Sequence, residues 1–276
     1  MNNFWQRAVS SVFIVIVLVA SFLLRQLVDV RLMFILFYFF ALAGTFEMVR
    51  AMGERLTFFT KCVVWAYALT VTPVYVVFGI DAVGIVFVCA PLLLLFGMLF
   101  EFDKTDVEKL SCGFFSLFYP TGLLIPMLQV NMLEKNALVA LMLIFLISPC
   151  SDVMAYVVGS LIKGPKLCEK LSPKKTVSGA IGGLLGGTVA AVFLWIFYAK
   201  GKVVENLTAE LILFILLGLF GSMFTELGDL IEGAVKRKFG IKDMGNLLPG
   251  HGGILDRIDG NMICAAFIHF VFMFLA

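Results

Sequence analysis

The chain has 276 residues, of which 61% are hydrophobic and only 14% are charged. Soluble domains are about half apolar and about a quarter charged, so this composition excludes an ordinary soluble domain and indicates a protein that folds in the lipid bilayer. The formal net charge of +2 does not point to a class of partner, and we expect no nucleic-acid partner.

Long apolar runs follow one another along the chain. A membrane-spanning helix needs about 20 mostly apolar residues. Nine segments reach or nearly reach that length: 8–24, 32–49, 62–78, 80–100, 110–130, 137–162, 176–198, 211–227 and 258–276. The sequence therefore predicts an all-α fold, a polytopic transmembrane helical bundle of about nine spans. The first run is expected to be a retained span, and Pro120 and Pro126 predict a kink in the fifth.

The basic residues predict an orientation. With nine spans, most Lys and Arg side chains fall on one face, which the positive-inside rule assigns to the cytoplasm together with the N-terminus. Two long polar loops, 163–175 and 228–257, lie on that face. We expect an integral protein of the cell (inner) membrane with its active site on the cytoplasmic side. Residues 1–136 would form an N-terminal transmembrane region of about five spans, and residues 137–276 a catalytic transmembrane region.

Carboxylates gather at the ends of the last two spans. Glu226, Asp229 and Glu232 are spaced i, i+3, i+6 on a helix that would continue the eighth span, and Asp256 and Asp259 open the ninth. Carboxylates beside lipid are costly to bury, so a functional role is the first hypothesis. Salt bridges to neighbouring basic residues are the structural alternative.

The ligand chemistry of this region favours magnesium. Oxygen ligands without clustered His or Cys suit Mg²⁺, which takes one or two carboxylates plus substrate phosphates. Asp229 and Asp256 lie where the last two spans meet the cytoplasm, and we expect them to hold the metal.

A glycine-rich loop lies between these carboxylates. Glycines in the segment 249–253 allow backbone N–H groups to approach a phosphate closely. Basic residues surround it, namely Lys236, Arg237, Lys242 and Arg257. The segment is therefore interpreted as a phosphate cradle, in which His251 donates a hydrogen bond or moves a proton.

Three further features precede this region. Lys174 and Lys175 lie at the predicted membrane surface, within reach of anionic headgroups. The glycine pairs 182/186 and 183/187 predict a close-packing helix face, which favours a homodimer. Asp152, inside the sixth span, would either line a polar cavity or cap a broken helix.

The residues from Gly233 to Asp259 resemble the signature of phosphatidate cytidylyltransferases, also called CDP-diacylglycerol synthases. That pattern is S-x-x-K-R-x4-K-D-x-G-x2-L-P-x-H-G-G-x2-D-R-x-D. The matching positions are Lys236, Arg237, Lys242, Asp243, Gly245, Leu248, Pro249, His251, Gly252, Gly253, Asp256, Arg257 and Asp259. The elements around Asp152, Ser172–Thr176 and Asp229 are also similar to the family, so the resemblance covers roughly 148–260.

The resemblance implies an Mg²⁺-dependent nucleotidyltransferase of phospholipid biosynthesis that converts CTP and phosphatidate to CDP-diacylglycerol and diphosphate. The catalytic residues would be Asp229, Asp256, Lys242 and His251. Substrate phosphates would be bound by Lys174, Lys175, Lys236, Arg237, Gly252, Gly253 and Arg257. Asp152, Glu232, Asp243 and Asp259 would support them. A second, monovalent cation such as K⁺ is expected by analogy.

Three positions depart from the family pattern. Gly233 replaces the opening serine, Ser178 replaces an acid, and Gly260 replaces a serine. None of the expected metal carboxylates is lost, so activity is still expected.

Two other classes of function are compatible with parts of the sequence. A secondary transporter fits Asp152 and the glycine-rich spans, but no duplicated half is recognisable, and the polar residues crowd at one surface. A non-catalytic membrane scaffold would tolerate the loss of Asp256.

Overall fold

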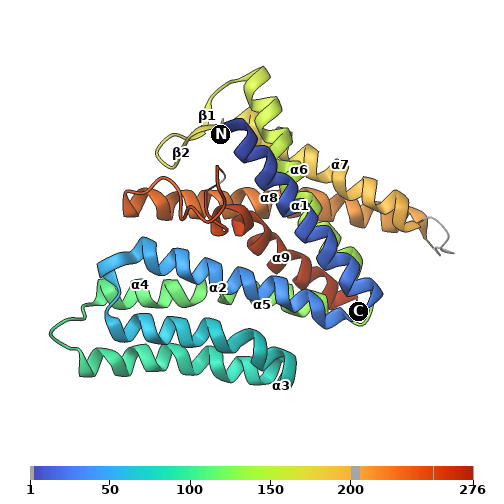
Figure 1. The fold of residues 1–276 in the computed structure, drawn as a ribbon. Helices are drawn as coiled ribbons and strands as arrows, with labels where there is room; N and C mark the ends of the chain where they lie inside the picture. The colour runs from blue at the N-terminus through green and yellow to red at the C-terminus, as the bar shows by residue number, and fades with distance from the viewer. Residues whose placement is uncertain (1–2, 200–205, 251, 276) are drawn as a thin grey trace. The chain divides into compact units, whose positions relative to one another are not determined.

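The computed structural model describes residues 3–199, 206–250 and 252–275, and most of them are helical (Figure 1). The helices are α1 (Asn3–Leu27), α2 (Met33–Met52), α3 (Phe58–Phe100), α4 (Val107–Phe118), α5 (Ile125–Asn131), α6 (Ala137–Ile162), α7 (Val177–Ala199), α8 (Leu207–Phe239) and α9 (Leu255–Leu275). Eight helices in the described part are long and apolar enough to cross a membrane. The predicted all-α polytopic membrane fold is confirmed, whereas the number of spans and the side of the N-terminus stay predictions.

The chain divides into two compact units. Unit 1 comprises Met1–Gln129 and Phe239–Arg257, and unit 2 comprises Val130–Lys238 and Ile258–Ala276. The signature segment is therefore shared: residues 239–257 belong to unit 1, whereas residues 233–238 and 258–259 belong to unit 2. The predicted division at 136/137 concerns function and is not tested by this division into compact units.

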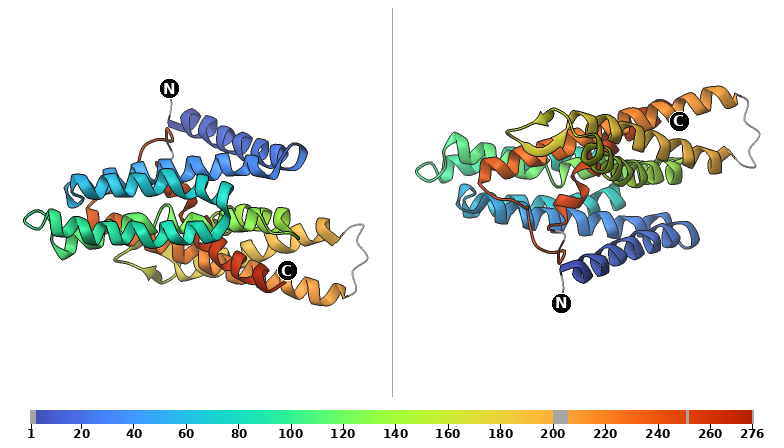
Figure 2. Two further views of the ribbon diagram at one scale, coloured as in Figure 1. Left: turned by 90° about the horizontal axis from the view of Figure 1, so that it is seen from below. Right: turned by 90° about the horizontal axis from the view of Figure 1, so that it is seen from above.

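In unit 1, the 43-residue helix α3 is a helical hairpin. Gly79 has φ 80° and ψ −169°, which interrupts the helix at the position where the sequence separates two apolar runs. A Cβ on Gly97 would overlap the ring of Phe59. In a straight helix, Phe59 and Gly97 would be separated by roughly 57 Å at about 1.5 Å per residue. The parts of α3 before and after Gly79 must therefore fold back on each other. Figures 1 and 2 show them side by side.

The fifth predicted span is kinked, as its prolines suggest. α4 ends at Phe118, before Pro120, and a short 3₁₀ helix (Gly122–Leu124) connects it to α5. Proline lacks the N–H that an uninterrupted helix requires, so the helix is broken at this place. α2 packs beside it, with Thr45 Oγ1 lying 3.2 Å from Thr121 Oγ1. The buried side of α2 includes Met33, Phe37 and Met48, and its only acidic residue is buried too.

In unit 2, glycines allow α7 to pack closely against α6 and α8. A Cβ on Gly186 would lie 2.5 Å from Met154 Cβ, and one on Gly182 would lie 2.5 Å from Val158 Cβ. The predicted close-packing face is confirmed, and it is filled by helices of the same chain. The glycine pairs therefore no longer support a homodimer.

The loop predicted at 163–175 contains two short antiparallel strands, β1 (Lys166–Cys168) and β2 (Ser172–Thr176). Thr176 Oγ1 accepts the Gly179 N–H at 3.1 Å, which caps the start of α7. Lys174 and Lys175 are thus held on a strand next to a helix N-terminus. The small hairpin is the one exception to the all-α prediction in the described residues.

The close helix contacts predict a stability difference between two glycines. Gly218→Ala would place a Cβ 2.6 Å from Thr188 Cα and 2.9 Å from Gly187 O, which are backbone atoms that cannot rotate away. We expect a loss of about 1–3 kcal/mol in the free energy of unfolding in detergent. At Gly84, a Cβ would meet nothing within 4 Å. Gly84→Ala should be neutral or slightly stabilising. Equal unfolding midpoints for the two variants would contradict this packing.

Candidate active site

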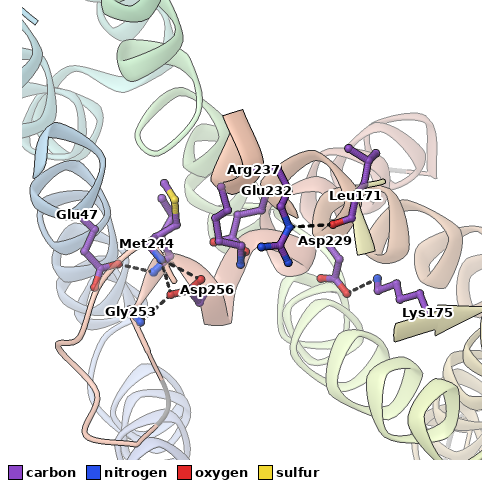
Figure 3. A network of polar contacts seen from close by, with 11 residues as sticks. Glu47, Leu171, Lys175, Asp229, Glu232, Arg237, Met244, Gly253 and Asp256 are labelled. Carbon is purple, nitrogen blue, oxygen red and sulfur yellow. Dashed lines mark hydrogen bonds and ion pairs between the residues drawn. The ribbon is translucent and has the colours of Figure 1, made fainter. Parts of the chain in front are cut away.

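The start of α9 is held by two carboxylates of unit 1 (Figure 3). Asp256, in the first turn, accepts the Gly253 N–H at 2.7 Å and the Met244 N–H at 3.0 Å through Oδ2. Glu47 of α2 accepts the Ile254 N–H at 3.0 Å and the Leu255 N–H at 2.8 Å. The first N–H groups of a helix lack intrahelical acceptors, so these carboxylates satisfy donors that would otherwise be orphaned.

The loop from Gly240 to Ile254, here called the signature loop, is closed by a tight turn. Leu248 donates its N–H to Gly252 O at 3.0 Å, and the left-handed φ of Gly252, 88°, allows the chain to reverse there. Ser10 of α1 donates to Pro249 O at 2.8 Å, and Arg50 of α2 donates to Asn246 Oδ1 at 3.0 Å. The loop is therefore tied to the first two helices of the chain.

A pocket of about 620 Å³ opens beside this loop. Lys242 and Arg257 line it together with Asp243 and Gly252. The volume lies within the usual range for small-molecule sites, and two cations at one pocket suit a ligand with several negative charges. The predicted residues Lys242, Asp243, Gly252 and Arg257 are thus brought together. His251 lies outside the described residues.

Unit 2 places an ion pair between its β-hairpin and α8. Lys175 Nζ lies 2.7 Å from Asp229 Oδ2, and both side chains are partly exposed. The prediction that a helix would continue the eighth span through Glu226, Asp229 and Glu232 is confirmed, because α8 runs to Phe239. One helix thus carries all three carboxylates. Figure 3 shows Asp229 directed toward Lys175.

Two predicted phosphate-binding residues have partners within unit 2. Lys236 Nζ lies 2.6 Å from Glu232 Oε2, one turn earlier on α8, and Arg237 Nε donates to Leu171 O at 3.4 Å. Glu232 is 1% exposed, so its charge requires a compensating cation close by. The contact of Glu232 with Lys236 is the kind of salt bridge that was the structural alternative to a functional role for these carboxylates. A role in phosphate binding stays a prediction for both basic residues.

A second pocket, of about 270 Å³, lies within unit 2. Lys174 and Lys175 line it with Asp152 and Glu226. α6 is continuous through Asp152, so the structure favours the cavity over the broken helix for this residue. In the described part of the chain, the buried Glu226 Oε1 makes no hydrogen bond. A bound polar group or water would satisfy that acceptor.

The departures at Gly233 and Gly260 have different surroundings. A Cβ on Gly260 would lie 2.7 Å from Thr225 Cγ2 and 3.1 Å from Ser148 Oγ, so glycine is required where α9 crosses the other helices of unit 2. A Cβ on Gly233 would meet only Leu171 O, at 3.8 Å. The third departure, Ser178, donates to Lys163 O across the base of the β-hairpin.

The predicted metal ligands belong to different units, Asp229 to unit 2 and Asp256 to unit 1. Among the residues that the structure describes, no group of three or more His, Cys, Asp or Glu could hold a metal ion. Mg²⁺ usually takes one or two carboxylates and completes its shell with waters and substrate phosphates. A carboxylate has about four lone-pair positions, so an ion pair at one oxygen of Asp229 leaves room for a cation. Asp229, taken by itself, therefore retains acceptor positions of the kind that Mg²⁺ takes.

Comparison with known proteins decides the family. A profile described as "Cytidylyltransferase family" matches residues 5–275. The chain belongs to the cytidylyltransferase family. It is 33% identical over 197 residues to a phosphatidate cytidylyltransferase of Bacillus subtilis, covering 70% of this chain and 69% of that protein. The phosphatidate cytidylyltransferase of Staphylococcus saprophyticus is 45% identical over 118 residues, which cover 43% of this chain and 43% of that protein. That of Brucella abortus is 41% identical over 142 residues, which cover 49% of this chain and 47% of that protein.

Three residues of the N-terminal region, none of them predicted from the sequence, bind the signature loop. Glu47, Arg50 and Ser10 all contact the signature loop or the start of α9. One signal was available: Glu47 is an acidic residue inside a long apolar run, which marks a functional candidate in a membrane protein. Ser10 and Arg50 carry no comparable signal.

The two glycine departures predict different responses to restoring the family's serine. Gly260→Ser should lower the free energy of unfolding by about 1–3 kcal/mol, since the added atoms overlap Thr225. Gly233→Ser should fold as well as wild type, because the site is open and serine is the better helix former. Unfolding midpoints in detergent measure both. A stable Gly260→Ser protein would contradict the packing described here.

Proposed function

We propose that the chain is a phosphatidate cytidylyltransferase that converts CTP and phosphatidate to CDP-diacylglycerol and diphosphate. The observation that carries the proposal is the family match across residues 5–275, which includes the whole signature loop. The curated relatives named above bear that activity in their names. A transporter or a scaffold finds no support in these comparisons.

The reaction is a phosphoryl substitution at the α-phosphorus of CTP. A phosphate oxygen of phosphatidate forms a new bond to the α-phosphorus of CTP. The bond between that phosphorus and the oxygen that bridges to the β-phosphate breaks, and diphosphate leaves with the electron pair. The attacking oxygen is already anionic, so a strong general base is not required. Catalysis by positioning and charge neutralisation is therefore expected.

The two pockets suggest a separate role for each unit. In unit 1, Lys242 and Arg257 line the larger pocket, which suits the triphosphate of CTP. In unit 2, Lys174 and Lys175 line the smaller pocket together with the apolar Leu167, which suits a lipid phosphate carrying acyl chains. A water-soluble and a membrane-bound substrate would thus be recognised by different residues.

Mg²⁺ belongs to the same proposal. Asp229 and Asp256 are the residues that would hold it, and it would neutralise phosphate charge when bound. A second, monovalent cation such as K⁺ remains a prediction from the family resemblance. So does a homodimer, which would need a surface other than the glycine face of α7.

The proposed location is the cell (inner) membrane, with the site at the cytoplasmic face where CTP is available. The concentration of basic residues in the loops that carry both pockets supports it.

The proposal predicts a strong effect at Asp256. With CTP labelled at the α-phosphate, wild-type protein in detergent should move label into phosphatidate-derived lipid. Asp256→Asn should reduce that transfer by at least about 100-fold, because the proposed metal ligand loses its negative charge. The exposed Asp103 supplies the control, and Asp103→Asn should stay within twofold of wild type. Wild-type transfer by Asp256→Asn would exclude the role given to this carboxylate.

A second prediction separates the two substrates. Lys174→Met should raise KM for phosphatidate by about tenfold, because one charge-assisted hydrogen bond is lost. The same variant should leave KM for CTP within twofold of wild type. Lys170 lies exposed on the same hairpin and does not line the pocket, so Lys170→Met is the matched control. A rise in KM for CTP alone would assign this pocket to the nucleotide instead.

A further inference from the structure

Glu47 is a carboxylate without an assigned role in the interior of unit 1. It lies on α2, inside a helix long and apolar enough to span the membrane, and it is 0% exposed. Burying a carboxylate is costly unless hydrogen bonds or charges compensate it. Its partners should therefore explain why this chain keeps an acid at that position.

Those partners are the first backbone amide of α9 and the amide of the residue before it. Glu47 Oε1 accepts from Ile254 N at 3.0 Å, and Oε2 accepts from Leu255 N at 2.8 Å, across more than 200 positions of sequence. Both oxygens are used, one for each amide. A negative charge is also favourable at a helix N-terminus. The carboxylate thus fixes both the position and the direction in which α9 begins.

Two glycines of the signature loop are shaped around the same carboxylate. A Cβ on Gly245 or on Gly253 would overlap the Glu47 carboxylate atoms. Neither glycine has a left-handed φ, so the requirement for glycine here comes from the close approach of Glu47. The loop and the α2 carboxylate therefore form one tightly packed contact.

The contact controls residues that the proposed reaction uses. Three successive amides are divided between two acids: Gly253 donates to Asp256, and Ile254 and Leu255 donate to Glu47. Movement of this segment would change the hydrogen bonds of Asp256. It would also displace Lys242 and Arg257, which line the pocket beside the loop. Arg50, the basic residue one turn later on α2, interacts electrostatically with Glu47 and binds Asn246 of the same loop.

We propose that Glu47 is a positioning residue, which locks the signature loop and the first turn of α9 so that Asp256, Lys242 and Arg257 are held in place for CTP and its metal. It touches neither substrate and acts through the backbone of residues 253–255. Its kinetic effect rests on the proposed function. Its structural effect does not.

The test uses the full-length protein in detergent with three variants. Glu47→Gln keeps the shape but can accept from only one of the two amides, and Glu47→Asp keeps the charge on a shorter side chain. Glu54, exposed on the short 3₁₀ helix after α2, provides the control Glu54→Gln. Hydrogen exchange of peptides covering 240–257 is measured first, without substrate. Glu47→Gln should exchange faster there and as wild type elsewhere, and Glu54→Gln should match wild type throughout.

The kinetic arm distinguishes positioning from general damage. For Glu47→Gln, KM for CTP and the Mg²⁺ concentration for half-maximal activity should rise by about tenfold, as for other residues that orient metal ligands. KM for phosphatidate should stay within twofold, and Glu47→Asp should recover part of the loss. General unfolding would instead lower the active fraction and leave each KM unchanged.

A double variant tests the direct contact. Gly253→Ala should lower kcat/KM for CTP by at least about tenfold in the wild-type background and by less than twofold in a Glu47→Ala background, because the overlapping carboxylate is gone. Additive effects would overturn the proposal, as would unchanged exchange in 240–257. If wild-type protein transfers no label from CTP, the proposed reaction fails, while the exchange experiment still decides the role of Glu47.

Discussion

Hydrogen bonds from the beginning of α9 to two carboxylates, the buried Glu47 and the half-buried Asp256, are the interaction on which the site in unit 1 depends. A buried backbone N–H group needs an acceptor, and the described residues of the signature loop, 240–250 and 252–254, form neither helix nor sheet apart from one bridge. Glu47 and Asp256 supply acceptors for three amides of this loop and for the first amide of α9. An irregular loop rich in glycine thereby becomes a defined surface with Lys242 and Arg257 along one pocket.

In unit 2, glycines in the helices make room for polar groups of neighbouring helices. Gly183 lies against Glu226 and Ser151, Gly187 against Ser222, and Gly228 against the backbone of Asp259. Glycine lets helix backbones approach closely, and the space saved at each crossing is occupied by a polar group of the neighbouring helix. The same helices carry Asp229 toward Lys175 on the β-hairpin. In this unit Asp229 and Glu232 are thus paired with lysines, whereas Glu47 and Asp256 in unit 1 accept from backbone amides.

Local composition made several features of the fold predictable from the sequence alone. The apolar runs, the break at Gly79 and the kink at Pro120 were foreseeable, because solvent and backbone sterics decide them. The charged residues that line the larger pocket were also predictable, since they lie within one short signature. Contacts between distant segments were not: Glu47, Arg50 and Ser10 reach the signature loop through tertiary packing, which leaves no periodicity to read. The glycine face of α7 was predicted correctly as a packing surface, but its partner proved to lie within the chain.

The glycines of the signature show how a motif can be explained at two levels. In the sequence, Gly252 and Gly253 predicted a phosphate cradle. In the structure, both glycines also have a role in the packing of the loop. The φ of Gly252 permits the turn, and Gly253 makes room for Glu47 while its N–H binds Asp256. A residue pattern typical of phosphate binding therefore also serves to assemble the loop. Substrate contact by these amides stays a prediction.

The most direct test of the proposed reaction measures both of its products in one sample. Purified protein in vesicles receives CTP and Mg²⁺ with and without phosphatidate, and diphosphate and CDP-diacylglycerol are both quantified, the lipid by mass spectrometry. The proposed reaction predicts that the two products appear in equal amounts, only with phosphatidate, and that EDTA stops both. Diphosphate release without phosphatidate, or a nucleotide-free lipid product, from well-folded protein would contradict it.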